Sequence, residues 1–229
     1  MYMSLLPYDY LFKIIVIGNA GTGKSSLCTR LIEGRIPYHY DTTIGVEFFS
    51  KVVSYRDEQD KSDQKIKIHL WDTAGQESFR SIIRSYYRDV AGVFLVFDMS
   101  RRSSFTDLRY WLDEIKRNGP VEAPEMLVLA NKSDLPDYTE NVSHLEIEEF
   151  CKANSLDFMY TSAKNDSIEE AASKLVEKIY KRYTQGPKKG ETPGIRLPPE
   201  KMELNNKMYR ENIYQAFGSE VKDKCCKIM

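Results

Sequence analysis

The stretch GNAGTGKS at residues 18–25 decides the fold, because it matches GxxxxGK[ST] and lies between an apolar run and a helical pattern. Its glycines let the backbone curl so that successive N–H groups point inward, and the following helix adds its positive N-terminal end. The stretch predicts a nucleoside triphosphate site, and a glycine turn before a helix is the simpler alternative. We expect the phosphate-binding residues to be Gly21, Thr22, Gly23, Lys24, Ser25, Ser26 and, from a later segment, Gly75.

Apolar runs and amphipathic segments alternate along the chain. Runs such as VFLVF and MLVLA are typical of parallel strands covered on both faces, so the sequence predicts a doubly wound α/β fold. Residues 47–55 and 65–71 instead alternate apolar and polar side chains, which indicates an antiparallel hairpin at the sheet edge with an exposed polar loop. The expected strand and helix pairs are residues 11–17 and 24–34, 93–97 and 103–118, and 126–130 and 143–153.

Composition favours one domain followed by a tail. With 229 residues, 41% of them hydrophobic, the chain can bury one core and leave a segment outside it. The net charge of −1 gives no basic excess, so we expect no nucleic-acid partner. The four cysteines form no metal-binding pattern, and the first ten residues resemble neither a signal peptide nor a membrane span. Because QGPKKGETPGIRLPPE cannot continue a helix, we expect an extension at 1–8, a globular domain at 9–183 and a flexible tail at 184–229.

The segment WDTAGQE at residues 71–77 has the side chains that act around a γ-phosphate. Asp72, at the end of an expected strand, is placed to hold Mg²⁺ through water, and Gly75 offers an unobstructed amide. Gln76 can orient a water molecule in line with the γ-phosphorus, so we expect it to be the catalytic residue. An ordinary surface turn is the alternative.

The segment YDTTIGVEF at residues 40–48 completes the expected magnesium site. Thr43 can supply a second hydroxyl ligand beside that of Ser25 when the γ-phosphate is present. Such a segment is ordered with GTP and loosens with GDP, which predicts a switch. The alternative is an ordinary loop that enters an edge strand.

Residues 131–134, NKSD, follow an apolar run and therefore lie where parallel sheets bind ligands. The Asp134 carboxylate can accept hydrogen bonds from the N1–H and 2-amino groups of guanine. Adenine has neither donor and would leave a buried charge unpaired, so the sequence predicts GTP rather than ATP. TSAK at 161–164 can add a backbone N–H to the guanine O6. The expected guanine-binding residues are Asn131, Lys132, Asp134, Ser162, Ala163 and Lys164.

In this order, GNAGTGKS, TIGVEF, WDTAGQESFR, RSYYR, NKSD and TSAK resemble the Ras-like small GTPases and, within them, the Rab family, over about residues 9–183. The resemblance implies a P-loop fold with a mostly parallel six-stranded sheet, one antiparallel edge strand and helices on both faces. It also implies a GTP/GDP and Mg²⁺-dependent switch of vesicle trafficking, with slow GTP hydrolysis that an activating protein stimulates. The implied partners are an exchange factor, a GTPase-activating protein, a GDP-dissociation inhibitor, a prenylation escort protein and effectors.

The same resemblance implies an effector surface at Ile44, Phe48, Trp71 and Tyr86. For each aromatic residue, simple burial beside the edge strand is an equal alternative. One position departs from the family, because Ile36 stands where these GTPases usually pack a phenylalanine against guanine. We expect weaker packing of the base and faster nucleotide exchange.

The chain ends in CCKIM, and paired terminal thiols indicate prenylation. A CaaX pattern at Cys226 would need an aliphatic residue where Lys227 stands. The ending better resembles the double-cysteine pattern of Rab-like chains, which implies prenylation of both Cys225 and Cys226. Two lipids give stable anchoring. We therefore expect the chain on the cytoplasmic face of a membrane, with a cytosolic pool. The wording around GNAGTGKS and ESFRSIIRSYYR resembles the Rab branch that acts on endosomal and early secretory membranes, which implies those membranes. Residues 202–217 show some helical spacing.

Two other classes of protein stay open from the sequence. A P-loop kinase or ATPase would tolerate adenine, which NKSD opposes. A scaffold would bind GTP without hydrolysing it, and hydrolysis rates of the wild type and a Gln76→Leu variant would separate it from a switch.

Overall fold

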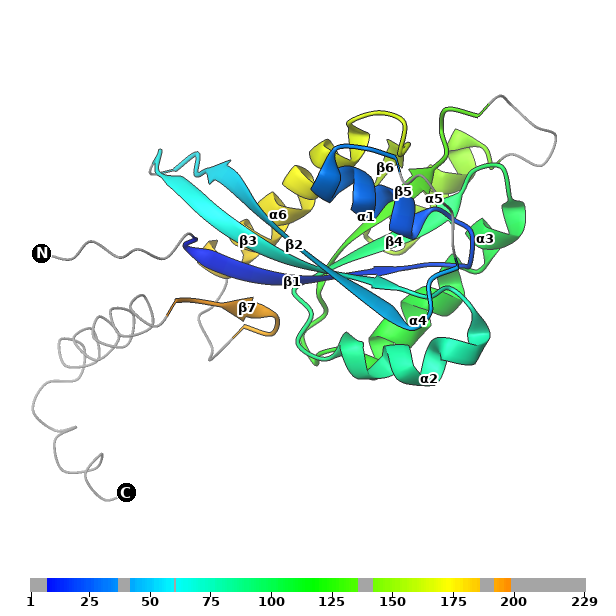
Figure 1. The fold of residues 1–229 in the computed structure, drawn as a ribbon, viewed down its shortest axis with the longest axis horizontal. Helices are drawn as coiled ribbons and strands as arrows, with labels where there is room; N and C mark the ends of the chain where they lie inside the picture. The colour runs from blue at the N-terminus through cyan, green and yellow to red at the C-terminus, as the bar shows by residue number, and fades with distance from the viewer. Residues whose placement is uncertain (1–7, 37–41, 60, 136–141, 186–191, 199–229) are drawn as a thin grey trace, which may run out of the picture.

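A mixed β-sheet with helices on both faces forms the framework of the protein (Figure 1). The computed structural model describes residues 8–36, 42–59, 61–135, 142–185 and 192–198. The strands lie in the order β2-β3-β1-β4-β5-β6. Within this order β2 is antiparallel to β3 and the other neighbours are parallel, which confirms the predicted mostly parallel sheet with one antiparallel edge strand. Their bounds are β1 (Tyr10–Ile17), β2 (Val46–Arg56), β3 (Asp63–Thr73), β4 (Gly92–Asp98), β5 (Glu125–Asn131), β6 (Asp157–Thr161) and β7 (Ile195–Arg196).

Two groups of helices cover the two faces of the sheet. The first group is α1 (Lys24–Glu33) and α6 (Ser167–Gln185), and the second contains α4 (Leu108–Asn118) and α5 (His144–Ala153). Helix α5 begins with a capping box between Ser143 and Glu146. The helix expected at 103–118 is interrupted at Asp107, where ψ is −4°. The shorter elements are η1 (Glu77–Phe79), α2 (Arg80–Ile83), η2 (Arg84–Tyr87) and α3 (Arg102–Thr106).

The central strands are buried on both faces because their side chains are apolar throughout. Every residue of β4 is buried. Along β1, Ile14 and Val16 pack in the core beneath α1 and α6, whereas Ile15 and Ile17 pack in the core beneath α4 and α5. Successive residues of a strand point to opposite faces, so one apolar run supplies both cores. This double packing fixes the carboxyl ends of β1, β4 and β5 side by side.

Strand β7 adds a seventh strand where the sequence predicts a flexible tail. Strand β4 first pairs with β1 at Ile14, and β7 pairs antiparallel with the earlier part of β1 on that side. Lys13 N–H donates to the Gly194 carbonyl at 2.8 Å. Gly194 has a φ of 75°, and a Cβ there would lie 2.1 Å from the backbone nitrogen of Ala91, so only glycine fits. Residues 192–198 are therefore part of the folded domain.

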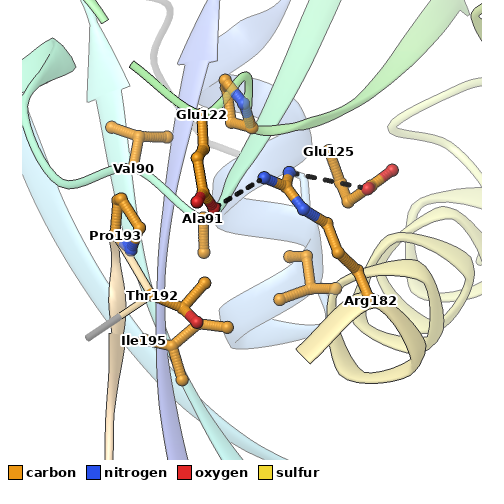
Figure 2. Close-up of a pocket in the computed structure, with 10 residues that line it drawn as sticks. Val90, Ala91, Glu122, Glu125, Arg182, Thr192, Pro193 and Ile195 are labelled. Carbon is orange, nitrogen blue, oxygen red and sulfur yellow. Dashed lines mark hydrogen bonds and ion pairs between the residues drawn. The ribbon is translucent and has the colours of Figure 1, made fainter. Parts of the chain in front are cut away.

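A small hollow lies between β7 and α6 (Figure 2). Thr192, Pro193 and Ile195 line one side of it. On the other side the Arg182 guanidinium lies 3.5 Å from a Glu122 carboxylate oxygen and 3.7 Å from a Glu125 carboxylate oxygen.

Only two residues of β7 pair with β1, which is too short a stretch to show a strand pattern in the sequence.

Candidate functional site

Residues 18–23 form the phosphate loop between β1 and α1, Lys24 and Ser25 begin α1, and the path of the loop depends on two glycines. Gly18 has a φ of 145°, and a Cβ there would lie 2.1 Å from the Val96 carbonyl oxygen. Gly23 has a φ of 91°, and its Cβ would lie 2.5 Å from Asn131 Nδ2. The loop backbone thus packs directly against β4 and β5. At the carboxyl ends of parallel strands, with a helix N-terminus beside it, such a loop can bind a polyanion.

Lys24, the first residue of α1, is almost completely buried against this loop, with 5% of its surface exposed. Its Nζ donates to the carbonyl oxygens of Gly18 at 3.0 Å and Asn19 at 2.9 Å. Burial lowers the pKa of Lys24 to about 8, against the opposing effect of Asp72, and nearby Arg101 lowers it as well. A bound polyphosphate would favour the charged ammonium.

The other expected phosphate-binding residues follow the same loop. Gly21 has a φ of 73°, and Thr22 is fully buried with its Oγ1 donating to Asn19 O at 3.0 Å. Ser26 lies in the first turn of α1, where backbone N–H groups have no intrahelical acceptor. The first turn of α1 therefore offers backbone donors to a phosphate, whereas the Thr22 N–H already donates to Asn19 O at 3.4 Å.

The three expected magnesium ligands converge on one point. Ser25 Oγ lies 2.7 Å from Thr43 Oγ1 and donates to Asp72 Oδ2 at 2.5 Å. Asp72 is fully buried, which raises its pKa to about 6, and its Oδ1 has no hydrogen-bond partner in the described part of the chain. An unpartnered carboxylate oxygen beside two hydroxyls fits Mg²⁺, which takes few protein oxygens and keeps water and phosphate ligands. When bound, Mg²⁺ neutralises charge on the β- and γ-phosphates.

Gly75 and Gln76 lie between β3 and η1, and Gly75 packs against the phosphate loop. A Cβ on Gly75 would lie 2.2 Å from the backbone nitrogen of Ala20, so the two segments touch. Gln76 has an extended backbone (φ −80°, ψ 144°), and its carbonyl accepts from Phe79 N–H at 3.2 Å at the start of η1. The expected water-orienting residue thus directly follows the contact with the loop.

Asn131 joins three segments that surround the loop. It is 2% exposed, its Nδ2 donates to Thr22 O at 2.7 Å, and its Oδ1 accepts from Thr161 Oγ1 at 3.3 Å. Lys132 has a φ of 62°, and its Nζ lies 2.7 Å from Asp98 Oδ2. Burial raises the pKa of Asp98, but hydrogen bonds, first that from Lys132, hold it below its ordinary value. Asp98 was missed by the sequence analysis, although a polar residue that ends a buried strand is a usable signal.

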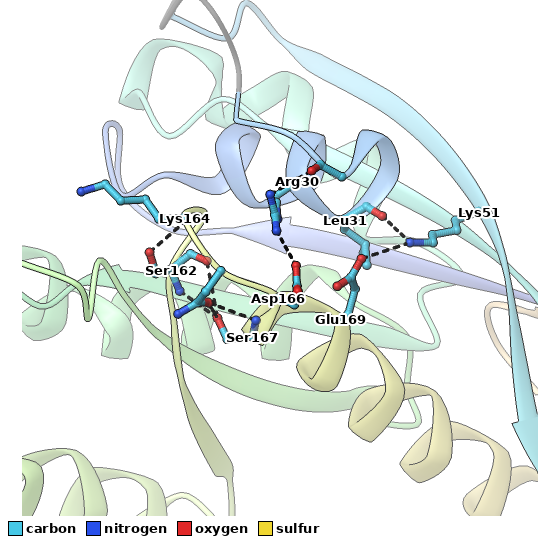
Figure 3. Close-up of polar contacts among 10 residues, drawn as sticks. Arg30, Leu31, Lys51, Ser162, Lys164, Asp166, Ser167 and Glu169 are labelled. Atoms are coloured by element: carbon cyan, nitrogen blue, oxygen red, sulfur yellow. Dashed lines mark hydrogen bonds and ion pairs between the residues drawn. The ribbon is translucent and has the colours of Figure 1, made fainter.

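Asp134 is held as a charged acceptor. Its Oδ1 accepts from Ser162 Oγ at 2.6 Å, and its Oδ2 lies 2.6 Å from Lys164 Nζ. Burial raises the pKa of Asp134, but these two contacts outweigh burial and leave it below the ordinary value. Ser162 N–H donates to Ser167 Oγ and Lys164 N–H to Ser162 Oγ (Figure 3). Among the described residues, the Ala163 N–H has no such acceptor, which leaves it for a base carbonyl.

The loop that contains Ser162 is braced against α1 (Figure 3). Arg30 of α1 pairs with Asp166, directly before α6. Lys51 of β2 lies 3.6 Å from Glu169 and donates to Leu31 O at 2.5 Å. These contacts fix the start of α6 relative to the phosphate loop at the other end of α1.

Three residues of the expected effector surface, Phe48, Trp71 and Tyr86, lie in a row across β2, β3 and η2, and the fourth, Ile44, lies two residues before β2. Ring centroids are 4.9 Å apart for Phe48 and Trp71 and 5.1 Å apart for Trp71 and Tyr86. Phe48 is 49% exposed and Ile44 is 80% exposed, so simple burial does not explain these two. Trp71 and Tyr86 are partly buried.

Asn19 is a further residue that the sequence analysis missed. Its Nδ2 donates to Asp107 Oδ2 at 2.6 Å, and its Oδ1 accepts from the buried Trp111 Nε1 at 2.7 Å. The phosphate loop is therefore attached to the start of α4. Nothing in the motif pattern marks this position, because GxxxxGK[ST] leaves it unspecified.

Some expectations fall at or beyond the limits of the described chain. Cys225, Cys226 and residues 202–217 lie outside it. Ile36 is the last described residue before a gap, and it is 36% exposed. No helix in the described ranges has the length and apolar character to cross a membrane.

The architecture around residues 18–25 is that of the P-loop proteins that bind guanine nucleotides, since the loop, the carboxylate suited to Mg²⁺ and the guanine acceptor lie at one edge of the sheet. Several families share this arrangement. Residues 13–181 match the family model described as the Ras family, and the chain belongs to that family. It is therefore a GTP-binding small GTPase, a class that binds GTP and GDP with Mg²⁺, hydrolyses GTP and interacts with exchange factors, activating proteins and effectors.

Proposed function

We propose that this chain is a Rab-type GTPase that regulates intracellular vesicle trafficking, cycling between a GTP-bound, effector-binding state and a GDP-bound state. The observation that carries the switch is the contact of Thr43 with the Ser25 hydroxyl, which in turn donates to Asp72. A single hydroxyl thus connects the segment before β2 to the site for Mg²⁺ and the γ-phosphate. Thr43 can act as a Mg²⁺ ligand only when the γ-phosphate is present, so loss of the γ-phosphate would release the segment before β2.

Hydrolysis follows from the residues around the loop. Lys24 holds the β- and γ-phosphates, the Gly75 amide faces the γ-phosphate, and Gln76 orients the attacking water. The structure places Gly75 against the loop, so Gln76 begins from a fixed backbone position. We expect slow intrinsic hydrolysis that rises when a GTPase-activating protein contributes an arginine.

The Rab assignment is supported by the row of Phe48, Trp71 and Tyr86 with the neighbouring Ile44. An exposed apolar patch that spans two strands and the segment after Gln76 can change shape with the nucleotide and suits a protein effector. The segments TIGVEF at residues 43–48 and SYYR at residues 85–88, which contain Ile44, Phe48 and Tyr86, also resemble Rab GTPases. Binding of a Rab effector that requires GTP, and its loss in Phe48→Ala, is the expected result.

Single-turnover GTP hydrolysis tests the enzymatic part. Gln76→Leu removes the water-orienting amide and is expected to slow the wild-type rate, whereas Gln59→Leu, on the exposed hairpin loop, serves as the matched control. Equal rates for the wild type and Gln76→Leu would instead support a protein that binds GTP without using it as a timer.

Membrane attachment is the second part of the proposal. We expect prenylation of Cys225 and Cys226, placement on the cytoplasmic face of endosomal or early secretory membranes, and a cytosolic pool held by a GDP-dissociation inhibitor after delivery by an escort protein. Mass spectrometry of the single and double Cys→Ser variants would count the lipids. Unchanged membrane localisation of the double variant would contradict the anchor.

A further inference from the structure

Arg101 lies in the loop between β4 and α3 and reaches across to the phosphate loop, although no sequence motif marks it. Its Nη2 donates to the Ala20 carbonyl oxygen at 2.6 Å. A Cβ built on Gly21 would lie 3.5 Å from Nη1 and 3.9 Å from Nη2. The guanidinium therefore rests against the middle of the phosphate loop.

The turn that carries Arg101 is fixed by its own hydrogen bonds. Arg101 N–H donates to Asp98 O at 3.0 Å. Ser104, which is 1% exposed, donates from Oγ to Arg101 O at 2.7 Å and accepts from Asp98 N–H at 3.0 Å. The backbone of Arg101 is thus held by contacts within its own turn, and such preorganisation is the condition for electrostatic stabilisation without reorganisation.

No acidic side chain accounts for the position of Arg101. Within the described residues it forms no ion pair, and its Nε is buried without a hydrogen-bond partner. The next residue provides a contrast, because the Arg102 guanidinium pairs with Glu146. The charge of Arg101 is left beside a loop that is built to hold an anion.

Two cations consequently lie at the same loop. Lys24 Nζ donates to the carbonyl oxygens of Gly18 and Asn19, and the Arg101 guanidinium donates to the next carbonyl, that of Ala20. A polyphosphate at the loop would lie between the two positive charges and would meet a guanidinium whose planar fork matches phosphate oxygens.

We propose that Arg101 is a catalytic residue for GTP hydrolysis, with its guanidinium contacting the polyphosphate and stabilising the negative charge that develops as the γ-phosphoryl group is transferred. The inference rests on the GTPase function proposed above. The water oxygen forms a bond to the γ-phosphorus while the bond to the bridging oxygen breaks, and that electron pair stays on the β-phosphate of GDP. One water proton remains on inorganic phosphate and the other passes to solvent. Arg101 exchanges no proton and acts by its charge, as an arginine supplied within the chain.

Single-turnover hydrolysis by the full chain with GTP and Mg²⁺ tests this role. Arg101→Ala is expected to slow hydrolysis at least about tenfold, since intrinsic rates with and without an arginine in cis differ by that order or more. Arg101→Lys keeps the positive charge but lacks the planar guanidinium, so its hydrolysis rate should lie between those of the wild type and Arg101→Ala. Arg102→Ala, the matched control at the next position, should leave the rate unchanged.

A second measurement separates catalysis from structural support. GDP with aluminium fluoride resembles the phosphoryl group in transfer and binds best where the transition state is stabilised. The wild type should bind this pair without any activating protein and Arg101→Ala should not, while affinity for GDP alone changes less. Should Arg101→Ala fail to fold, Arg101→Gln keeps a donor toward Ala20 O without the charge, and the same two measurements apply to it.

Equal hydrolysis rates in the wild type and Arg101→Ala, with Gln76→Leu slower than both, would overturn the inference and leave the GTPase function standing. A loss of GDP affinity as large as the loss of rate would assign Arg101 to ground-state binding and also overturn it. Absence of hydrolysis in the wild type would contradict the GTPase function itself.

Discussion

Replacing Asn19 by alanine tests whether α4 holds the phosphate loop in place. Asn19 Oδ1 accepts from Trp111 Nε1 at 2.7 Å, and Trp111 is completely buried. Alanine would leave that indole N–H without a partner, which costs about 1–3 kcal/mol of unfolding free energy. The second bond, to Asp107, lies at the surface and adds little. For a domain of this size, the expected fall in melting temperature is about 2–12 °C.

Denaturation by urea at one fixed, saturating concentration of GDP and Mg²⁺ is the suitable assay, because bound nucleotide contributes to apparent stability. Asn19→Ala, Trp111→Phe and the double variant form a cycle that separates the hydrogen bond from the lost indole packing. We expect the single changes to be non-additive, because Trp111→Phe also removes the donor. Additive effects, or a loss in Asn19→Ala below about 0.5 kcal/mol, would refute the anchoring role.

Three further changes test the site and one helix cap. Asp134→Asn should weaken GTP binding at least about 100-fold, because the charged acceptor for two guanine donors is lost. Calorimetry should also show that the affinity for xanthosine triphosphate rises relative to that for GTP, because the 2-oxo group of xanthine accepts a hydrogen bond from the asparagine amide. The Glu146 carboxylate, bonded first by Arg102 and then by the helix cap, has its pKa lowered from 4.5 to about 2. The contribution of this carboxylate to stability is complete above pH 4.5 and is lost as the pH falls toward 2. In Glu146→Gln the denaturation midpoint should therefore depend less on pH between 4.5 and 2 than in the wild type. Ile36→Phe should slow release of a fluorescent GDP analogue by restoring an aromatic contact with the base, and an unchanged off-rate would contradict the expected role of Ile36.

The parts of the fold that the sequence predicts are those fixed by local pattern. Apolar runs such as that of β4 require cover on both faces, and the alternation in β2 and β3 requires an edge hairpin. The site motifs likewise define which residues meet, because strand ends and one glycine-rich loop bring them to the same edge.

Other parts depend on contacts between segments far apart in the chain. Asn19 and Trp111 are joined across the domain, and neither residue type signals the other in the sequence. Arg101 belongs to a polar turn whose direction is set by Ser104, so its proximity to the phosphate loop emerges only in three dimensions. Strand β7 is stabilised by pairing with the open edge of β1 and by the close packing of Gly194 against Ala91, not by any pattern of its own.

Pairing of β7 with β1 reduces the number of residues between the folded domain and Cys225. Counted from Gln185 at the end of α6, the sequence to Cys225 has 40 residues (186–225), but counted from Pro198 it has 27 (199–225). At about 3.4 Å per residue, the greatest distance that this sequence can span falls from about 135 Å to about 90 Å. Strand β7 pairs with Leu11 and Phe12, at the opposite end of β1 from the phosphate loop. A membrane anchor at Cys225, as proposed above, would therefore be connected to the end of the sheet remote from the nucleotide, and the edge with the nucleotide site would stay accessible to partners.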